Sequence, residues 1–373
     1  MATRIAIIHF QPLELYPPIL NLLKYIDGDR DFELKVFTTA PVIKKNNYEY
    51  SNIQVKRFRN CSKPGNIFNR AISYLGFYVG TFFGLIKKNP DIVFYYETES
   101  SFPAYLYILL NRKKLMIHYR EYNDSKWYKN TARHIAWFHR LEKKYLYKKA
   151  IWISQTNEVR LQFFLQDINA DYDRSVHHTF PNYPPRQWRL SARKSKSNDN
   201  HIKLVYTGTL SLEGSFLDKL VTWVLKYKER ISLTLYSYNI SPDALQYFQG
   251  LDSDSIILKP DGIHYHEMPA ILRQYDYGLI IYKTLSSNYV YNIPNKFFEY
   301  LACGIGVIFP NGMNLMKPYI NQFPDGSIIQ ADFEKLDQET LAILMEHKSN
   351  GLEVSSPFFC ESVFSGVIEK MKN

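Results

Sequence analysis

At 373 residues the chain is long enough for two domains, and its hydrophobic fraction of 46% is ample for two cores. Its three cysteines, Cys61, Cys303 and Cys360, fit no zinc-binding spacing and are a poor count for disulfides, so we expect reduced thiols in a cytosolic protein. The net charge of +10 lies in the first half, because residues 1–185 hold 27 Lys and Arg against 16 Asp and Glu, whereas residues 186–373 hold 19 against 20.

This charge asymmetry favours an anionic partner for the N-terminal half: nucleic acid, anionic lipid or an acceptor that carries phosphate. A lysine-rich composition set by the genome is the alternative, and it explains the abundance of lysine better than its uneven placement.

Strands and helices alternate along the N-terminal half. The first residues, MATRIAIIHF, lack the apolar core and cleavage site of a secretory signal and are typical of a first strand. The alternation predicts right-handed βαβ units and an open parallel sheet. The expected strands are 5–10, 32–38, 91–96, 114–118 and 151–154, with helices between them that begin with 18–26.

Polar residues follow the first strand in the loop HFQPLELYPP. Ligands collect at the carboxyl ends of strands in open α/β sheets, and His9 ends this strand. His9 is therefore a candidate base for an acceptor hydroxyl, and Gln11 and Glu14 are candidate acceptor contacts. A histidine that packs or caps at the strand end is the alternative.

Two further loops carry candidate carboxylates. Glu97 and Glu99 follow the strand DIVFYY, and they would point the same way if the strand continued. Glu97 is a candidate base and Glu99 a candidate acceptor contact, with exposed loop charge as the alternative. Arg120 and Glu121 lie in HYREYND, after the next strand.

Two helical segments raise the question of a membrane. Residues 71–86 are uncharged but shorter than the roughly 20 residues of a spanning helix. Gly76, Gly80 and Gly84 give them one smooth face, so we expect a core helix, with an interfacial helix as the alternative. Residues 133–149 form a basic amphipathic pattern that suits an anionic bilayer as well as an ordinary surface helix.

The C-terminal half repeats the α/β alternation after a polar linker at 186–200. A final helix is expected at 361–371. We therefore expect domains at 1–185 and 201–360, the second a doubly wound unit like the first. Its expected strands are 203–207, 232–236, 255–259, 277–282 and 306–309, and its expected helices include 216–227 and 266–275. The pair His177 and His178, before the linker, is interpreted as surface or linker.

The most informative segment is YNIPNKFFEYLACGIGVIFP, residues 291–310. Pro294 suits the first turn of a helix, and Gly304 suits the position just past its end. Lys296 and Glu299 share a face of this helix, and Asn292 lies on the same side, about two turns before Glu299. A helix start with a cation and a carboxylate can hold an anion and a polyol, which a nucleotide-sugar supplies as diphosphate and ribose.

This segment resembles the donor-site signature of GT-B glycosyltransferases, especially the family 4 group (glycosyl transferases group 1). The resemblance implies two Rossmann-like domains that face each other across a cleft, with the last helix packed back on the first domain. It also implies that Glu299 binds the donor ribose. Asn292 stands where the family usually has an earlier glutamate, and in HYREYND Glu121 is retained while Arg120 replaces a histidine that faces the sugar.

The opening YTGTL of the second half resembles the family's glycine loop, but the Arg and Lys that usually follow it are missing. Lys219 lies too deep in the next helix, so Lys296 and Lys283 are the nearest substitutes for stabilising a diphosphate. The tripeptides at 171–173 and 252–254 match D-x-D only formally, so we expect no metal and no cofactor. The expected donor contacts are Gly208, Thr209, Lys283, Ser287, Asn292, Asn295, Lys296 and Glu299, and the expected catalytic residues are His9, Glu97, Glu121 and Lys296.

These features predict a glycosyltransferase that moves a sugar from a nucleotide-sugar to a glycan or lipid-linked acceptor in bacterial surface-polysaccharide synthesis. The resemblance favours metal-independent transfer with retention of configuration. A cytoplasmic protein is expected, with peripheral contact to the inner face of the plasma membrane and no nucleic-acid partner. Two alternatives stay open: a nucleotide-sugar epimerase on the same fold, and a non-catalytic basic protein that binds membranes or nucleic acid.

Overall fold

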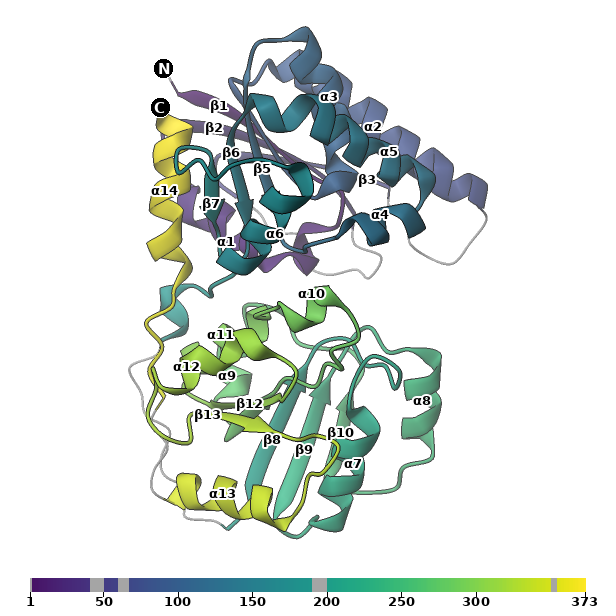
Figure 1. Ribbon diagram of the computed structural model, residues 1–373, viewed down its shortest axis with the longest axis vertical. Coiled ribbons are helices and arrows are strands. Elements are labelled where there is room, and N and C mark those ends of the chain that lie inside the picture. The colour runs from purple at the N-terminus through teal and green to yellow at the C-terminus, as the bar shows by residue number, and fades with distance from the viewer. Residues whose placement is uncertain (1, 41–49, 60–66, 190–199, 350–353) are drawn as a thin grey trace. The chain divides into compact units, whose positions relative to one another are not determined.

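The computed structural model describes residues 2–40, 50–59, 67–189, 200–349 and 354–373, and Cys61 and most of segment 186–200 lie outside these ranges. The chain forms two compact units, each built around its own parallel sheet (Figure 1). The first unit is Met1–Asn182 together with Cys360–Asn373, and the second is Tyr183–Phe359.

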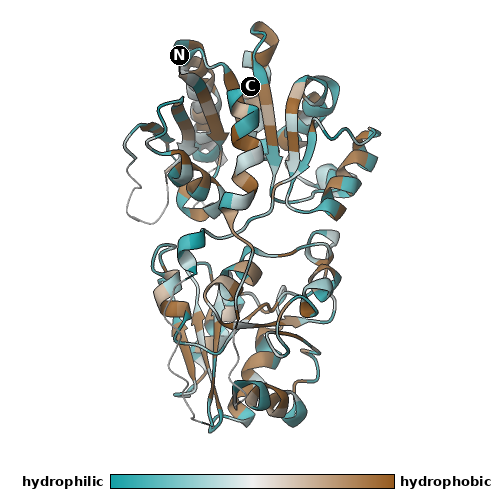
Figure 2. Cartoon of the chain, turned by 90° about the vertical axis from the view of Figure 1, so that its left-hand side faces the viewer, coloured by the Kyte–Doolittle hydropathy of each residue, from teal (hydrophilic) through white to brown (hydrophobic). Residues whose placement is uncertain are grey.

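The first unit has a sheet of seven parallel strands in the order β3-β2-β1-β4-β5-β6-β7. The strands between its two edge strands, β3 and β7, are mostly buried, and Figure 2 shows them as mostly hydrophobic. The order reverses between β1 and β4, which makes the unit a doubly wound Rossmann-like fold. The strands are β1 Thr3–His9, β2 Phe32–Thr39, β3 Ile53–Phe58, β4 Ile92–Tyr96, β5 Lys114–Tyr119, β6 Ala150–Gln155 and β7 His177–Thr179.

Helices cover this sheet. The core that includes Phe37, Tyr95 and Tyr119 also contains side chains of α2, α3, α5 and α6, and α2, α3 and α5 lie together in Figure 1. The last helix, α14, packs on α1, where the Phe364 ring meets Tyr25 at 5.3 Å. The helices are η1 Leu13–Leu15, α1 Pro17–Ile26, α2 Ile67–Lys88, η2 Thr98–Ser100, α3 Ser101–Leu110, α4 Ser125–Asn130, α5 Arg133–Leu141, the π-helical turn η3 Glu142–Leu146, η4 Tyr147–Lys149, α6 Glu158–Ile168 and α14 Cys360–Lys372.

The second unit repeats the plan with six parallel strands in the order β10-β9-β8-β11-β12-β13, whose reversal lies between β8 and β11. Its strands are β8 Ile202–Thr207, β9 Ile231–Tyr236, β10 Ile256–Lys259, β11 Tyr277–Leu279, β12 Gly306–Pro310 and β13 Ile328–Ala331. Its helices are η5 Arg186–Trp188, α7 Leu217–Lys226, α8 Pro242–Gln249, α9 Met268–Leu272, α10 Ser287–Val290, α11 Asn295–Ala302, η6 Asn314–Met316, α12 Lys317–Ile320 and α13 Gln338–Ser349.

The predicted α/β class and doubly wound sheets are confirmed, whereas β3, β7 and β13 were not predicted. Two details were wrong. His177 is a buried residue of β7 rather than a surface or linker residue, and its ring Nδ1 accepts the backbone N–H of Asp173 at 3.0 Å. The segment 266–275 forms only the short helix α9, because the chain enters its helix at Met268.

The amphipathic segment 133–149 turns its apolar side inward. Ile135, Phe138 and Leu146 belong to the core, and Trp137 is the large apolar residue of this segment that stays exposed. Within the described ranges no helix combines the length and apolarity needed to cross a bilayer.

Candidate functional site

The reversal of strand order gives each unit one preferred place for a ligand, just beyond the carboxyl ends of the strands. In the first sheet His9 lies opposite Tyr96 in the register of β1 and β4, so their following loops start side by side. In the second sheet β8 and β11 meet in the same way, and Gly208 follows β8 directly.

Glu97 follows the carboxyl end of β4, and both its backbone conformation and its side-chain contacts are restricted. Its φ of 64° lies in the left-handed region, which costs a residue with a side chain about 1–3 kcal/mol and recurs at functional sites. The carboxylate oxygen Oε1 accepts the backbone N–H of Arg120 at 2.8 Å and faces the Tyr16 hydroxyl at 3.4 Å. Burial raises the pKa of Glu97 to about 8, against a smaller lowering by Arg120. A carboxyl group with this pKa can exchange a proton near neutral pH.

Arg120 and Glu121 lie beside Glu97. The guanidinium of Arg120 donates to Glu121 Oε1 at 2.8 Å and lies over the Tyr16 ring, 5.0 Å from its centre. Burial alone would lower the pKa of Arg120, but Glu121, Tyr16 and Glu97 outweigh it and raise that pKa. The structure therefore brings Arg120, Glu121 and Glu97 together, as a cation between two carboxyl groups.

Arg160 holds the backbone of Arg120 in place through its side chain. It is 2% exposed, and its Nη1 donates to the carbonyl of Arg120 at 2.7 Å and to Thr156 Oγ1 at 3.0 Å. Burial lowers the pKa of Arg160 to about 10, against Glu121 and Glu97, which raise it. No motif had pointed to Arg160, because an arginine inside an amphipathic helix is typical of an exposed face.

His9 is held as a neutral ring with one free nitrogen. Its Nδ1–H donates to the carbonyl of Gln11 at 2.8 Å, which leaves the Nε2 lone pair buried and without a bond from any described residue. Burial, helped by Arg120, lowers the pKa of His9 to about 3. The same cause lowers the pKa of the neighbouring His118 to about 3. Nε2 can therefore accept a hydrogen bond from a ligand that reaches it, but a pKa of about 3 makes His9 too weak a base for the predicted role toward an acceptor hydroxyl.

Three other predicted residues of this unit have different surroundings. Glu14 forms an ion pair with Arg57 of β3 at 2.6 Å, and the side chain of Gln11 is exposed. Glu97 and Glu99 were expected to point the same way only if the strand continued, and this condition is not met, because β4 ends at Tyr96 and Glu99 lies in the turn η2. Burial raises the pKa of Glu99.

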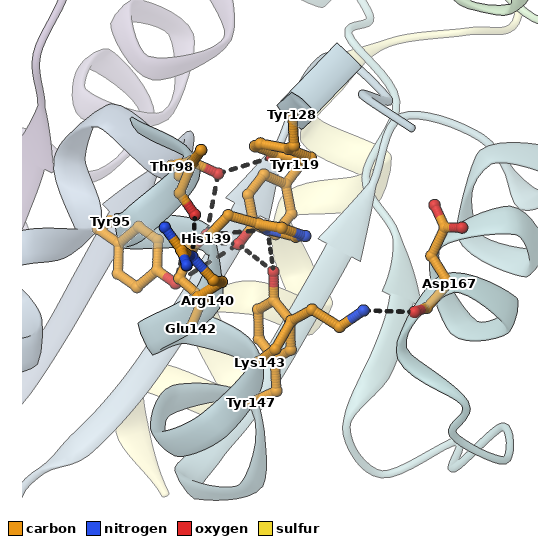
Figure 3. Close-up of polar contacts among 11 residues, drawn as sticks. Tyr95, Thr98, Tyr119, Tyr128, His139, Arg140, Glu142, Lys143, Tyr147 and Asp167 are labelled. Carbon is orange, nitrogen blue, oxygen red and sulfur yellow. Dashed lines mark hydrogen bonds and ion pairs between the residues drawn. The ribbon is translucent and has the colours of Figure 1, made fainter. Parts of the chain in front are cut away.

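Behind η2 lies a fully buried carboxylate that sequence reasoning missed. Glu142 accepts hydrogen bonds from the hydroxyls of Tyr119 at 2.7 Å, Tyr95 at 2.8 Å and Thr98 at 2.9 Å (Figure 3). Tyr128 bonds to Thr98 Oγ1 at 2.8 Å, so the cluster extends one residue further. Since Thr98 is the residue after Glu97, this cluster fixes the turn that carries Glu97. A lone glutamate before two lysines in a basic helix gave no signal of burial.

The donor-side candidates centre on the start of α11. Lys296 is the second residue of this helix, and its Nζ donates to the Tyr282 hydroxyl at 2.6 Å. A Cβ on Gly208 would lie 2.6 Å from Lys296 Nζ, and Gly208 has a φ of 142°, so only glycine leaves room for this approach. Lys296 therefore reaches the loop that follows β8.

Aromatic rings hold this lysine in place. Its Nζ lies 5.5 Å from the centre of the Tyr206 ring and 5.2 Å from that of Tyr282. Burial would lower the pKa of Lys296, but Tyr282 and Glu299 offset it and raise the pKa. Lys296 thus keeps its positive charge. Tyr206 and Tyr282 were not predicted, and their only sequence signal was their position at the ends of two strands.

Glu299 lies one turn along α11 and is 5% exposed. Burial raises its pKa to about 7, against the nearby charge of Lys296, which lowers it. Within the described part of the chain, no residue donates a hydrogen bond to its carboxylate. The oxygens of this nearly buried carboxyl group are thus open to a hydrogen-bond donor from outside the described residues.

The remaining donor-side residues surround this helix. The prediction that Asn292 shares a helix face with Glu299 is wrong, because α11 begins only at Asn295. Gly304 lies just past the end of this helix, as predicted, and has a φ of 76°. Lys283 donates to the carbonyl of Leu212 at 2.9 Å, and Thr209 accepts a bond from Asn239 at 3.3 Å. Ser287 is exposed at the start of α10, and Lys219 lies in α7, 3.6 Å from Glu334. Of the two candidate cations, Lys296 is the one beside Gly208.

Among the described residues no group of three His, Cys, Asp or Glu side chains is arranged to hold a metal ion. The tripeptide 252–254 lies between α8 and β10, and 171–173 lies in the segment before β7.

Solved structures provide the comparison, since neither a family model nor a curated protein matches the sequence. Anabaena HepE in complex with UDP-glucose is 11% identical, covers 99% of both chains and has a TM-score of 0.65. A sucrose-phosphate synthase from Thermosynechococcus elongatus is 12% identical over 99% of this chain and 98% of that one, with a TM-score of 0.62. A protein assigned as a UDP-N-acetylglucosamine 2-epimerase from Listeria monocytogenes is 16% identical over 100% and 96%, with a TM-score of 0.60. With two doubly wound units like those of these proteins, the chain has the GT-B fold.

Proposed function

We propose that the protein is a glycosyltransferase that takes its sugar from a nucleotide-sugar bound to the second unit. The observation that carries this proposal is the pair formed by Lys296 and Glu299 on α11, one beside Gly208 and the other nearly buried without a hydrogen-bond donor among the described residues. A cation beside a glycine loop suits a diphosphate, and a carboxylate one turn away suits the two hydroxyls of a ribose. The UDP and UDP-glucose complexes of HepE support a donor of this class.

Departure of the nucleotide is the step that Lys296 assists. As the glycosidic bond breaks, negative charge grows on the diphosphate, and a fixed cation stabilises that charge without having to reorganise. Lys296 meets this requirement because Tyr206 and Tyr282 hold its ammonium group in place. The proposal includes transfer without a metal ion and retention of configuration, both of which follow from the resemblance of residues 291–310 to family 4 enzymes.

The first unit holds the acceptor in this proposal. Glu97 would accept the proton of the acceptor hydroxyl, since its pKa of about 8 keeps it near the balance between the two protonation states. His9 would accept a hydrogen bond at Nε2, and Arg120 with Glu121 would orient polar groups of the acceptor. The surplus of basic residues in this half suits a phosphate-bearing, lipid-linked acceptor of surface-polysaccharide synthesis, such as those of capsule or lipopolysaccharide.

A nucleotide-sugar epimerase is the second candidate, favoured by the likeness to the Listeria protein. The two functions differ in what they require, because an epimerase turns over its nucleotide-sugar without an acceptor. A calorimetric panel of nucleotide-sugars would identify the donor. The bound compound would then be incubated with the enzyme alone and followed by NMR. The proposal expects binding of at least one nucleotide-sugar and no change of sugar configuration. Epimerised sugar would establish the second candidate, and failure of the whole panel to bind would contradict both.

A further inference from the structure

Helix α2 presents an apolar face to solvent along most of its length. Ile72, Leu75, Val79, Phe83 and Ile86 are spaced by three and four residues, which puts them on one side of the helix. Their exposed fractions are 50, 62, 43, 62 and 45%. From Ile72 to Ile86 the stripe covers fifteen residues, and the fourteen steps between them make about 21 Å at 1.5 Å per residue. We call these five residues the α2 stripe.

The opposite side of α2 supplies the side chains that pack into the core of the first unit, so the stripe is not a poorly packed core face. Phe77, Tyr78 and Leu85 are buried in the core of the first unit. A Cβ on Gly84 would lie 2.4 Å from the Phe37 ring, which shows how closely this side meets the sheet. Between Arg70 and Lys87, every exposed position of α2 is apolar. A contiguous apolar surface of this kind marks an interaction site in a protein that otherwise exposes polar residues.

Positive charge lies at both ends of the stripe. Helix α2 contains Arg70 before it and Lys87 and Lys88 after it, and no acidic residue in its sequence. Burial lowers the pKa of Lys35 on β2, and the neighbouring charges of Lys56, Lys88 and Lys87 lower it further. These lysines therefore lie close enough to repel one another. Glu33 pairs with Lys88 and removes part of this charge.

The neighbouring helix extends the apolar surface. α3 packs against α2, and its last two residues, Leu109 and Leu110, are 46 and 70% exposed. The C-terminal ends of α2 and α3 adjoin, because the Tyr107 hydroxyl donates to Asn89 Oδ1 at 3.2 Å. Arg112, two residues after Leu110, is exposed. Apolar side chains with cations at their borders thus occur on both helices, which lie together in Figure 1.

We propose that the α2 stripe is the surface through which the protein lies on an anionic lipid bilayer. Apolar side chains at this spacing enter the region between headgroups and acyl chains, while the bordering Lys and Arg side chains bind lipid phosphates. The helix lies flat on the bilayer, since its inner side is packed against the sheet. The basic segment 133–149 does not supply this surface, because its apolar residues are in the core.

Charge favours a bilayer over a second copy of the chain. In a two-fold interface the same patch occurs on both subunits, so Arg70, Lys87 and their neighbours would face identical patches without acidic partners on α2. An anionic bilayer offers the opposite charge along the whole border. The stripe also begins near the edge that carries the acceptor candidates, since Tyr74 of α2 stacks on Phe10, next to His9, at 4.7 Å.

The test uses the full chain and co-sedimentation with two kinds of vesicle: phosphatidylglycerol mixed with phosphatidylcholine, and phosphatidylcholine alone. The variant combines Leu75→Ala with Phe83→Ala, which shorten exposed side chains and keep good helix propensity. The control combines Leu245→Ala with Leu285→Ala, which shorten side chains of the second unit that are 43 and 68% exposed. Thermal melting of each protein confirms that it is folded, and the test needs no substrate.

Binding of the wild type to the anionic vesicles is expected to weaken as salt rises. The partition constant of the α2 variant is expected to fall at least about tenfold, because the variant removes much of two apolar side chains that the bilayer would bury. The partition constant of the control is expected to stay unchanged. Equal binding by variant and wild type, or equal binding of the wild type to neutral and anionic vesicles, would overturn the proposal. Sedimentation velocity supplies a further check, because a dimer that the α2 variant abolishes would assign the stripe to a second copy. A last variant changes four lysines of segment 133–149 together to Gln: Lys143, Lys144, Lys148 and Lys149. If this variant binds anionic vesicles more weakly and the α2 variant does not, the membrane-binding surface is segment 133–149 and the proposal is overturned.

Discussion

The backbone N–H of Arg120 donates to the carboxylate of Glu97 at 2.8 Å and links the ends of two neighbouring strands. Because this bond comes from the backbone, it does not depend on where the long Arg120 side chain lies. It holds a residue with a left-handed φ of 64° in a fixed position, next to a guanidinium and a second carboxyl group. The predictions for the first unit follow from this link.

The raised pKa of Glu97 predicts a pH-dependent stability. Unfolded Glu97 titrates near its ordinary value of 4.5, whereas in the folded protein it keeps its proton up to about 8. Between these values the unfolded chain binds fewer protons, so the free energy of unfolding falls as pH rises. His9 and His118, whose pKa values are lowered, act in the opposite direction only below their ordinary value of 6.5.

Glu299, whose pKa is raised to about 7, adds to this fall in its lower part, so the contribution of Glu97 is read from denaturant unfolding of wild type and Glu97→Gln side by side between pH 6.5 and 8. Wild type is expected to lose stability across this window, and Glu97→Gln is expected to reduce that loss. Parallel curves for the two proteins would mean that the pKa of Glu97 is not raised. In a transfer assay the same variant should lose most of its turnover if Glu97 is the base.

Replacement of Glu299 tests the donor site. Glu299→Ala is expected to weaken binding of the cognate nucleotide by about 1.5–3 kcal/mol, the scale of hydrogen bonds to a charged group. Since the pKa of Glu299 is about 7, wild-type affinity should also rise between pH 6 and 8 as the carboxylate forms. Calorimetry measures both effects, with Glu339→Ala in the exposed part of α13 as the control. An unchanged affinity in Glu299→Ala would remove this residue from the site.

The two lysines near the glycine loop are expected to differ. Lys296→Ala should lower turnover by about 10²–10³, the range for losing one preorganised electrostatic contact. Lys283→Ala should have the smaller effect, because Lys283 is bound to the carbonyl of Leu212. Activity is expected to persist in EDTA. Near-normal turnover in both variants, or loss in EDTA with rescue by magnesium or manganese, would contradict the account of the leaving group.

The buried carboxylate of Glu142 predicts a loss of stability that depends on the replacement. Glu142→Leu should lower the free energy of unfolding by about 3 kcal/mol or more, because three buried hydroxyls lose their acceptor at about 1–3 kcal/mol each. Glu142→Gln should cost less, since it keeps one acceptor oxygen and the hydroxyls can also accept from its amide. Chemical denaturation measures both. Equal stability of the leucine variant and wild type would show that the hydroxyls find other partners.

Much of the fold could be predicted because its strands are apolar on both faces and its helices begin and end at clear signals. Gly304 shows this, since its position after an apolar helix predicted the left-handed turn that the structure has. The edge strand β3 was missed because its sequence, IQVKRF, is partly exposed and charged. The edge strands β7 and β13 are short, so they too lack a continuous apolar run.

In the first unit the site was predictable only where the sequence places residues at the ends of strands. His9, Glu97 and Arg120 were found in this way, and their proximity follows from strand order. Arg160 and Glu142 were not found, because their burial depends on partners distant in sequence. The side-chain contacts of Glu99 and Glu14 were also beyond prediction, since one depends on where a strand ends and the other on the unpredicted strand of Arg57.

A crystal structure of the protein with its bound nucleotide-sugar tests the central claim most directly. The account predicts a diphosphate oxygen within hydrogen-bonding distance of Lys296 Nζ beside Gly208, and ribose hydroxyls that donate to the Glu299 carboxylate. A nucleotide bound elsewhere, with Lys296 still bonded only to Tyr282 and no ligand at Glu299, would contradict it.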